Sequence, residues 1–277
     1  MKLLTLNAHS LHEEKFPGQT EKLAEFLLRE APDLVALQEV NQSAVAPRLP
    51  AGRRRGFTLC VGEVPLRTDN FAVALVETMK KRGTSYFYTW LPVKRGYGVF
   101  DEGLAFLSKS PLTEAKGFYL TNSRDYGNWR TRMALCARVE DRDPLFCCIH
   151  TGWWQDGEEP FLRQWEALTE QLPREGTVWL MGDFNNPAEL RGEGYDRMLL
   201  SGWYDSYRLA SDPLGEETVR GVIDGWQGRA VGRERFRIDH LWCNRPAAVR
   251  DYRTVLDGRD GPVVSDHFGV MITVDHP

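Results

Sequence analysis

Polar side chains interrupt apolar, strand-like segments of this sequence at several separate places. Burying a carboxylate or an imidazole among apolar residues is costly unless a partner compensates it. A repeated interruption of this kind therefore points to shared chemistry. The residues concerned are Asn7 after LLTL, Glu39 in LVALQEV, His150 after LFCCI, Asp183 and Asn185 in TVWLMGDFN, Asp239 in FRIDHLW, and Asp266 and His267 in VVSDHFGV.

Each of these residues also has a simpler explanation when it is considered alone. Asp183 and Asn185 suit a turn, and Asn7 could cap a loop. His150 could be a hydrogen-bonded core histidine, and Glu39 could pair with an arginine. The repetition at strand ends favours a common site, because a sheet holds the residues at its strand ends in fixed positions.

The apolar patterns between these residues predict more strands than helices. Alternating or continuous apolar runs predict strands at 3–6, 34–40, 85–93, 103–108, 132–139, 145–150, 177–183, 236–244 and 268–274. Helical spacing predicts helices within 17–33, 69–83, 158–172 and 192–202, with Asp69 as an N-cap, Gly83 at C′ and Pro160 at N1. Because several strands follow one another with only loops between them, the pattern favours an α+β sandwich of sheets with outer helices.

Length, composition and charge narrow the class of protein. The 277 residues contain no linker or repeat, which predicts a single domain over 1–277. Five cysteines, two of them adjacent, predict free thiols in a reducing, cytoplasmic compartment, and no apolar run is long enough for a membrane span. A net charge of −4 makes nucleic acid a less favoured partner. The oligomeric state is left open.

Seven segments, taken in order, resemble the endonuclease/exonuclease/phosphatase superfamily. They run from Thr5 to Val270 and read TLNAHS, LVALQEV, EGLAFLS, CIHTG, MGDFNNP, RIDHLWCN and VVSDHFGV. The resemblance implies a four-layer α/β/β/α sandwich, in which two mixed sheets pack face to face between outer helices. It also implies a divalent-metal-dependent phosphoesterase.

The resemblance assigns expected roles to the polar residues. Asn7, Glu39 and Asp266 match the metal-site residues of the superfamily, and Asp183 and Asn185 match its GDFN pair. His150 and His267 match its two phosphate-facing histidines, and Asp239 matches the acid that supports the second one. Oxygen ligands without thiolates suit Mg²⁺, with Mn²⁺ as the alternative, better than zinc.

The loops between the motifs are expected to decide the substrate. Trp153 and Trp154 directly follow His150, and Arg130 and Arg132 flank a further tryptophan. Aromatic rings beside a phosphate centre can stack on a sugar or a base, and an arginine can bind phosphate through two hydrogen bonds. These four residues are therefore the predicted substrate-binding residues, although packing against loops would explain any single tryptophan.

The segments HTGWW, GDFNNPAELRGEGYD, SGWYDSY and VIDGW most resemble the bacterial branch of the superfamily that contains maltose 6'-phosphate phosphatase. The resemblance implies a phosphatase for a phosphomonoester of a small molecule, such as a sugar phosphate. The alternatives are a Mg²⁺-dependent nuclease of the DNase or abasic-site type, a sphingomyelinase-like phosphodiesterase, and a binding protein that lost its activity.

Overall fold

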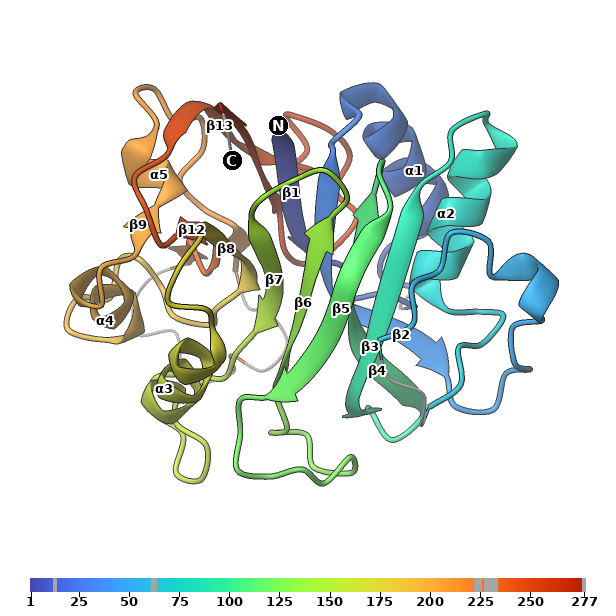
Figure 1. The fold of residues 1–277 in the computed structure, drawn as a ribbon, viewed down its shortest axis with the longest axis horizontal. Coiled ribbons are helices and arrows are strands. Elements are labelled where there is room, and N and C mark those ends of the chain that lie inside the picture. The colour runs from blue at the N-terminus through green and yellow to red at the C-terminus, as the bar shows by residue number, and fades with distance from the viewer. Residues whose placement is uncertain (12–13, 61–63, 222–225, 227–233, 276–277) are drawn as a thin grey trace.

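The computed structural model describes residues 1–11, 14–60, 64–221, 226 and 234–275. The helices are α1 (Gln19–Glu30), a 3₁₀ turn (Ala51–Arg53), α2 (Phe71–Lys81), α3 (Phe161–Gln171), α4 (Gly194–Leu200) and α5 (Ser206–Leu209). The strands are β1 (Lys2–Asn7), β2 (Leu34–Ser43), β3 (Phe87–Gly96), β4 (Phe100–Ser108), β5 (Leu112–Tyr119), β6 (Met133–Val139), β7 (Leu145–His150), β8 (Val178–Asp183), β9 (Tyr204–Asp205), β10 (Val219–Arg220), β11 (Arg235–Phe236), β12 (Asp239–Cys243), β13 (Ala248–Val255) and β14 (Gly269–Asp275). Figure 1 shows their arrangement.

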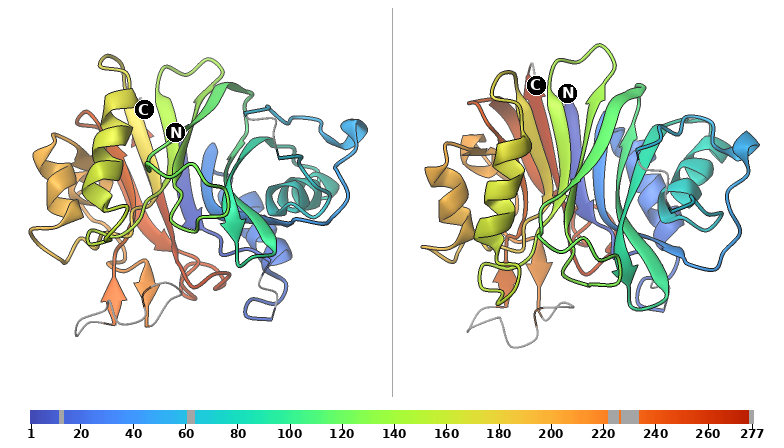
Figure 2. Two further views of the ribbon diagram at one scale, coloured as in Figure 1. Left: turned by 90° about the horizontal axis from the view of Figure 1, so that it is seen from below. Right: turned by 60° about the horizontal axis from the view of Figure 1, so that its bottom comes forward.

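Two mixed six-stranded sheets pack against each other in the centre of the molecule (Figures 1 and 2). The first sheet has the order β13-β14-β1-β2-β4-β3, and the second has the order β5-β6-β7-β8-β12-β9. Helices α1 and α2 cover the outer face of the first sheet, and α3 and α4 lie outside the second. This arrangement confirms the predicted α/β/β/α sandwich.

Alternation along the strands explains how three apolar layers form. In β1, Leu3 belongs to the layer between the two sheets, whereas Leu4 belongs to the layer under α1 and α2. Successive side chains of a strand point to opposite faces, so a strand that is covered on both faces must be apolar throughout. The same rule accounts for LVAL in β2 and for LFCCI in β7.

The predicted helices form, with two corrections at their N-termini. Asn70 caps α2 by accepting hydrogen bonds from the backbone N–H groups of Ala72 and Val73. Asp69, the predicted cap, instead accepts a hydrogen bond from the backbone N–H of Ser43. Pro160 stands at the N-cap of α3, one position before the predicted N1. Gly83 follows the C-cap of α2 with φ 89°, as predicted for C′.

Besides the two-residue strands β9, β10 and β11, two eight-residue strands were not predicted, because they lie at the edges of the sheets. β5 closes one edge of the second sheet, and β13 closes one edge of the first. Edge strands carry charged, half-exposed side chains, so their sequences resemble loops.

Within the part of the chain that the structure describes, no helix is long and apolar enough to cross a membrane.

Gly182 allows β7 and β8 to approach each other at their ends. A Cβ atom at this position would lie 1.9 Å from the carbonyl oxygen of Ile149, and the residue has φ 154°. The neighbouring residues on the two strands, His150 and Asp183, are paired in the same ladder. A side chain at position 182 would therefore push apart the strand ends that carry two of the predicted site residues.

We expect Gly182→Ala to lower the free energy of unfolding by about 2 kcal/mol or more, because the added methyl group meets backbone rather than a movable side chain. Urea denaturation measures this change. Gly52→Ala is the matched control, because its Cβ would meet nothing within 4 Å. Equal stability of the two variants would contradict the proposed close approach.

Candidate active site

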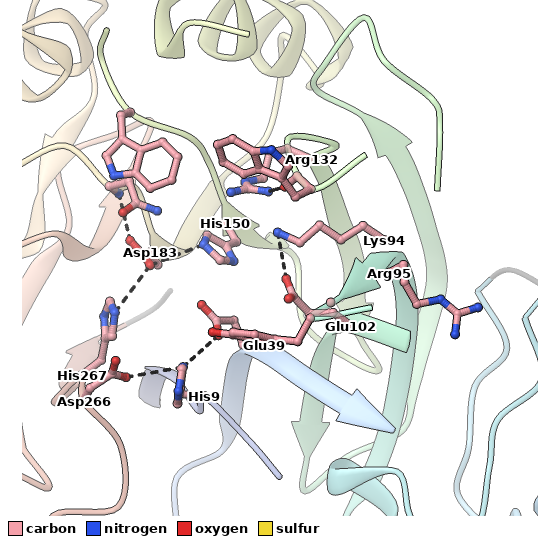
Figure 3. A pocket seen from close by; sticks show the side chains of 15 residues that line it. His9, Glu39, Lys94, Arg95, Glu102, Arg132, His150, Asp183, Asp266 and His267 are labelled. Carbon is pink, nitrogen blue, oxygen red and sulfur yellow. Dashed lines mark hydrogen bonds and ion pairs between the residues drawn. The ribbon is translucent and has the colours of Figure 1, made fainter. Parts of the chain in front are cut away.

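One cavity of about 420 Å³ gathers most of the predicted polar residues (Figure 3). It is lined by His9, Glu39, Lys94, Arg95, Gly96, Tyr97, Glu102, Trp129, Arg132, His150, Trp153, Asp183, Asn185, Asp266 and His267. Asn7 and Asp239 stand directly behind this lining, where they hydrogen-bond to Asp183 and His267. Segments separated by more than 250 residues thus meet at one site.

Strand register brings three of these residues into one row. Asp183 at the end of β8 pairs with His150 on the parallel strand β7 and with Asp239 on the antiparallel strand β12. Neighbouring positions in a ladder lie about 5 Å apart. The sheet therefore fixes the spacing of two carboxylates and one imidazole without help from any loop.

Glu39 reaches the cavity because β2 departs from regular strand geometry. Val35 and Leu37 face the helix layer, and regular alternation would send Glu39 the same way. Instead the pairing of β2 with β4 shifts register between Leu37 and Val40, and Glu39 has φ 50°. A β-bulge with a left-handed residue turns a side chain out of its face, and such strain is a common feature of functional sites.

Glu39 lies in a cluster with Asn7, His9 and Asp266. The Nδ2 atom of Asn7 donates to Glu39 Oε1 at 2.9 Å and to Asp183 Oδ2 at 3.1 Å. The Nδ1 atom of His9 is 3.2 Å from Glu39 Oε2 and 3.8 Å from Asp266 Oδ1. Burial disfavours the charged form of His9, but its hydrogen bond to Glu39 and the nearby carboxylates outweigh this effect and raise its pKa.

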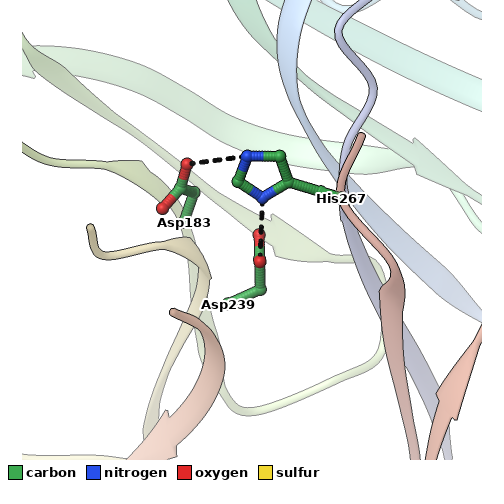
Figure 4. A group of neighbouring side chains, drawn as sticks. All are labelled: Asp183, Asp239 and His267. Atoms are coloured by element: carbon green, nitrogen blue, oxygen red, sulfur yellow. Dashed lines mark hydrogen bonds and ion pairs between the residues drawn. The ribbon is translucent and has the colours of Figure 1, made fainter. Parts of the chain in front are cut away.

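Asp183, Asp239 and His267 form a second cluster (Figure 4). The Nδ1 atom of His267 is 2.9 Å from Asp239 Oδ2, and its Nε2 atom is 3.9 Å from Asp183 Oδ2. Burial alone would lower the pKa of His267, but Asp239, followed by Asp183, raises it well above the ordinary value. His267 is therefore an imidazolium at neutral pH, with Nδ1–H donated to Asp239 and Nε2–H directed toward Asp183.

His150 has the opposite protonation state. Burial, followed by the positive charge of Arg132, lowers its pKa well below the ordinary value. Its Nε2 atom is 3.6 Å from Asp183 Oδ2. The site therefore combines one neutral and one cationic imidazole, and both can direct an N–H group into the cavity.

Asp183 is poised to exchange a proton near neutral pH. Burial and the charge of Asp239 raise its pKa to about 7, although His267 opposes the shift. A general base acts most efficiently when its pKa lies near the working pH. The carboxylate is held in place because Asp183 Oδ1 accepts from the backbone N–H of Asn185 at 2.8 Å.

The side chain of Asn185 is fixed from two sides. Its Nδ2 atom donates to the carbonyl of Thr151 at 2.9 Å, and its Oδ1 atom accepts from the indole N–H of Trp226 at 2.8 Å. An indole nitrogen can only donate, so Trp226 determines which end of the amide is oxygen. The second N–H of Asn185 Nδ2 remains as a donor for a ligand in the cavity.

The sequence matches a family model over residues 4–267, which is described as the endonuclease/exonuclease/phosphatase family. The chain belongs to this family. Its members hydrolyse phosphoesters and depend on divalent metal ions. No curated protein sequence matches the chain.

Solved structures agree with the family assignment. A family protein from Leptotrichia buccalis has a TM-score of 0.84 and 25% sequence identity, with 99% of both chains covered. A mannosyl-6-phosphatase from Bacteroides thetaiotaomicron has a TM-score of 0.61 and 17% identity over 99% of both chains. A 3'-5' exonuclease from Neisseria meningitidis has a TM-score of 0.62 and 19% identity, covering 99% of this chain and all of its own. The last two show a shared fold.

Among the residues that the structure describes, two places could hold a metal ion. Asp183, Asp239 and His267 bring ligand atoms within 4.8 Å of one another, but His267 Nδ1 and Asp239 Oδ2 already bind each other. Glu39 and Asp266 keep oxygen atoms open to the cavity, where water and substrate can complete the coordination of a hard cation. The oxygen donors of the second place fit a divalent cation better.

Asn7 differs from its predicted role in one respect. Its Oδ1 atom accepts from the backbone N–H of His9 at 3.2 Å, and its Nδ2 atom faces the two carboxylates. In this structure Asn7 orients Glu39 and Asp183 rather than offering an oxygen to a cation. A direct role of Asn7 as a ligand stays a prediction.

The four predicted substrate-binding residues divide into two groups. Arg132 and Trp153 line the cavity, whereas Arg130 and Trp154 are absent from its lining among the described residues. Arg130 pairs with Asp156 at 3.1 Å and stacks on Trp129, and Trp154 packs against Phe161. Arg130 therefore supports the cavity wall through Trp129, whereas Trp154 packs against the apolar layer under α3.

Several residues of the cavity lining had not been singled out from sequence. They include His9, Lys94, Arg95, Tyr97 and Glu102. His9 could have been predicted, because it lies two positions after Asn7 in the TLNAHS segment. Glu102 begins the EGLAFLS segment and had a similar signal, whereas Lys94 gave none, because charged residues near a strand end are usually exposed.

A buried polar network supports the Asp183–Asn186 turn from the other side. Arg237 contacts Asp205 Oδ2 at 2.8 Å and donates to His240 Nδ1 at 2.9 Å. The Nε2 atom of His240 is 3.3 Å from the carbonyl oxygen of Asn186. Since Nδ1 accepts from Arg237, the proton of neutral His240 is on Nε2, which donates to the carbonyl oxygen of Asn186. Burial and Arg237 lower the pKa of His240 to about 3.

His240 should make the stability of the protein sensitive to acid. In the unfolded chain a histidine has a pKa of about 6.5, so the unfolded state binds the proton first as the pH falls. We therefore expect stability to be lost from about pH 6.5 downward, by up to about 1.4 kcal/mol per pH unit from this residue.

His240→Gln should show a shallower loss of stability than the wild type between pH 6.5 and 4. The variant is expected to be less stable at pH 7, because Gln does not reproduce the rigid ring geometry that joins Arg237 to the carbonyl of Asn186. Urea denaturation at a series of pH values measures both effects. Parallel pH curves for the two proteins would show that His240 is not the group responsible.

Proposed function

We propose that this protein is a divalent-metal-dependent phosphatase that hydrolyses a phosphomonoester of a small molecule, such as a sugar phosphate. The observation that carries the proposal is the construction of the cavity. Asp183, Asp266 and His267 lie toward one end of the cavity, and Lys94, Glu102 and Arg132 lie toward the other, within about 420 Å³. Trp129 and Trp153 also line it. This volume lies in the range of small-molecule sites.

The metal ion is proposed to bind at Glu39 and Asp266, beside Asn7, and to be Mg²⁺, with Mn²⁺ as the alternative. Mg²⁺ favours one or two carboxylates together with water and substrate phosphate. When bound, such an ion polarises a phosphoryl oxygen and stabilises the leaving oxygen. Burial opposes the ionised form of Glu39, but His9 holds its pKa well below the usual range, so the ligand is a carboxylate at neutral pH.

The residues around Asp183 would carry the proton and the charge of the reaction. Asp183 accepts a proton from the attacking water, and Asn185 orients that water with its remaining N–H. His267, an imidazolium held by Asp239, donates Nε2–H to a non-bridging phosphate oxygen as negative charge develops. His150 donates a second N–H from its neutral ring.

The aromatic rim is proposed to hold the organic part of the substrate. The rings of Trp129 and Trp153 lie 5.8 Å apart, centre to centre, and both line the cavity. Indole faces of this kind stack on sugar rings. Arg130 stabilises the rim by stacking on Trp129 with 4.2 Å between its guanidinium carbon and the ring centre.

Five free cysteines, four of them buried, support a cytoplasmic location.

A hydrolysis panel tests the proposed function. Phosphorylated sugars and inositols are offered with Mg²⁺ and with EDTA, and released phosphate is measured; plasmid and an abasic-site duplex are offered in parallel and examined on gels. We expect metal-dependent phosphate release from a sugar phosphate with intact DNA, and its loss by orders of magnitude in Asp183→Asn. Cleaved DNA together with inert sugar phosphates would identify a nuclease instead.

Glu39→Gln should raise the Mg²⁺ concentration required for half-maximal activity by about tenfold or more, because a neutral amide is a weaker ligand for a hard cation. Direct Mn²⁺ binding, followed by electron paramagnetic resonance, should weaken in parallel. Glu77→Gln removes a carboxylate that pairs with Arg53 away from the cavity and serves as the control. An unchanged metal requirement in Glu39→Gln would remove Glu39 from the metal site.

A further inference from the structure

Lys94, Glu102 and Arg132 form a charged wall on the side of the cavity away from His267 and Asp266 (Figure 3). Lys94 is 7% exposed, Glu102 is 6% exposed and Arg132 is 5% exposed. The Nζ atom of Lys94 lies 3.1 Å from Glu102 Oε1. Charged side chains are rarely buried to this degree unless another charge compensates them.

The wall has one more positive charge than negative charge. Arg132 donates to the backbone carbonyls of Trp129 at 2.8 Å and Thr131 at 3.2 Å, whereas its Nε–H has no acceptor among the described residues. Glu102 is thus the single carboxylate of the wall, and it compensates the charges of both Lys94 and Arg132. Burial, followed by the charge of Arg132, lowers the pKa of Lys94, which shows that the two cations repel each other.

The chain bends to place Lys94 in this wall. The pairing of β3 with β4 shifts register between Pro92 and Lys94, and Lys94 then pairs directly with Glu102. The absence of a side chain at Gly96 leaves room for the carboxylate, because a Cβ there would lie 2.8 Å from Glu102 Oε2. A bulge and a glycine therefore fix an ion pair inside the cavity rather than on its surface.

Carboxylates at the other end of the cavity do not remove the need for an anion at the wall. Burial lowers the pKa of Arg132, and Glu102, followed by Glu39 and Asp183, only partly opposes this shift. In the metal-loaded protein Glu39 and Asp183 also face a divalent cation, so the excess positive charge of the wall is left for a ligand. A phosphate oxygen is the anion that this site would contain during the proposed reaction.

We propose that Lys94 and Arg132 bind the non-bridging oxygens of a dianionic phosphate group, and that this subsite makes the protein select phosphomonoesters over phosphodiesters. The inference rests on the proposed phosphatase function and adds the residues that determine selectivity. A monoester presents two negative charges to the wall. A diester carries one negative charge and places a second organic group where the wall offers charged donors.

The test compares p-nitrophenyl phosphate with bis(p-nitrophenyl) phosphate in wild-type protein, Lys94→Met and the double variant Lys94→Met/Glu102→Gln. The double variant removes both charges of the pair, so it stays informative if an unpaired Glu102 impairs folding. We expect kcat/KM for the monoester to fall about 10- to 150-fold in both variants, the loss typical of a hydrogen bond to a charged group. For the diester we expect a change below about threefold.

Binding of inorganic phosphate to the metal-loaded protein gives a readout that does not depend on turnover. Calorimetry should show weaker binding in both variants, by about the same factor as the loss in monoester kcat/KM. Lys109→Met is the matched control, because Lys109 is exposed and pairs with Asp33 outside the cavity. It should leave the ester preference and phosphate binding unchanged.

The outcomes separate this inference from the proposed function. If the wild-type protein hydrolyses monoesters but both variants lose activity on the two esters equally, or lose none, the subsite is refuted while the phosphatase function stands. If the wild-type protein cleaves diesters and leaves monoesters intact, the proposed function fails as well. A selective loss on the monoester together with weaker phosphate binding supports the inference.

Discussion

The concentration of carboxylates between the two sheets is the constraint on which the rest of the site depends. Glu39, Asp183, Asp239 and Asp266 meet in or beside one cavity, where water compensates charge poorly. The pKa values of the surrounding groups shift in response to this negative charge. His9 and His267 acquire raised pKa values beside carboxylates, whereas Asp183 acquires a raised pKa beside Asp239. The raised pKa values of His9 and His267 thus reflect a local excess of negative charge, whereas burial and Arg132 keep His150 neutral.

Departures from regular strand geometry place charged groups on opposite sides of the cavity. The bulge in β2 directs Glu39 into the cavity, and the register shift in β3 directs Lys94 into the opposite wall. Regular ladders fix the remaining positions, as with His150, Asp183 and Asp239 in one row. A sheet supplies rigid spacing, and a bulge changes the direction of one side chain without loosening its neighbours.

The Asp-His dipeptide occurs three times in the sequence, and the fold uses the copies at 239–240 and 266–267 differently. In one copy Asp239 supports His267, while the adjacent His240 turns away to Arg237 and the carbonyl of Asn186. In the other copy His267 binds Asp239, and Asp266 lies 3.8 Å from His9. Adjacent residues of a strand point to opposite faces, so one member of a pair can serve the site while the other supports its framework.

The sequence by itself determined the two-sheet sandwich, the family and most of the polar residues of the cavity, because alternation of apolar side chains and ordered motifs are properties of short segments. It did not reveal the edge strands β5 and β13, whose charged residues resemble loops, or the roles of His9, Lys94 and Glu102. The sequence also grouped Arg130 and Trp154 with Arg132 and Trp153 as substrate-binding residues, but of these four only Arg132 and Trp153 line the cavity. Tertiary structure decided these points, because the direction and protonation of a charged side chain depend on bulges and on partners far away in the chain.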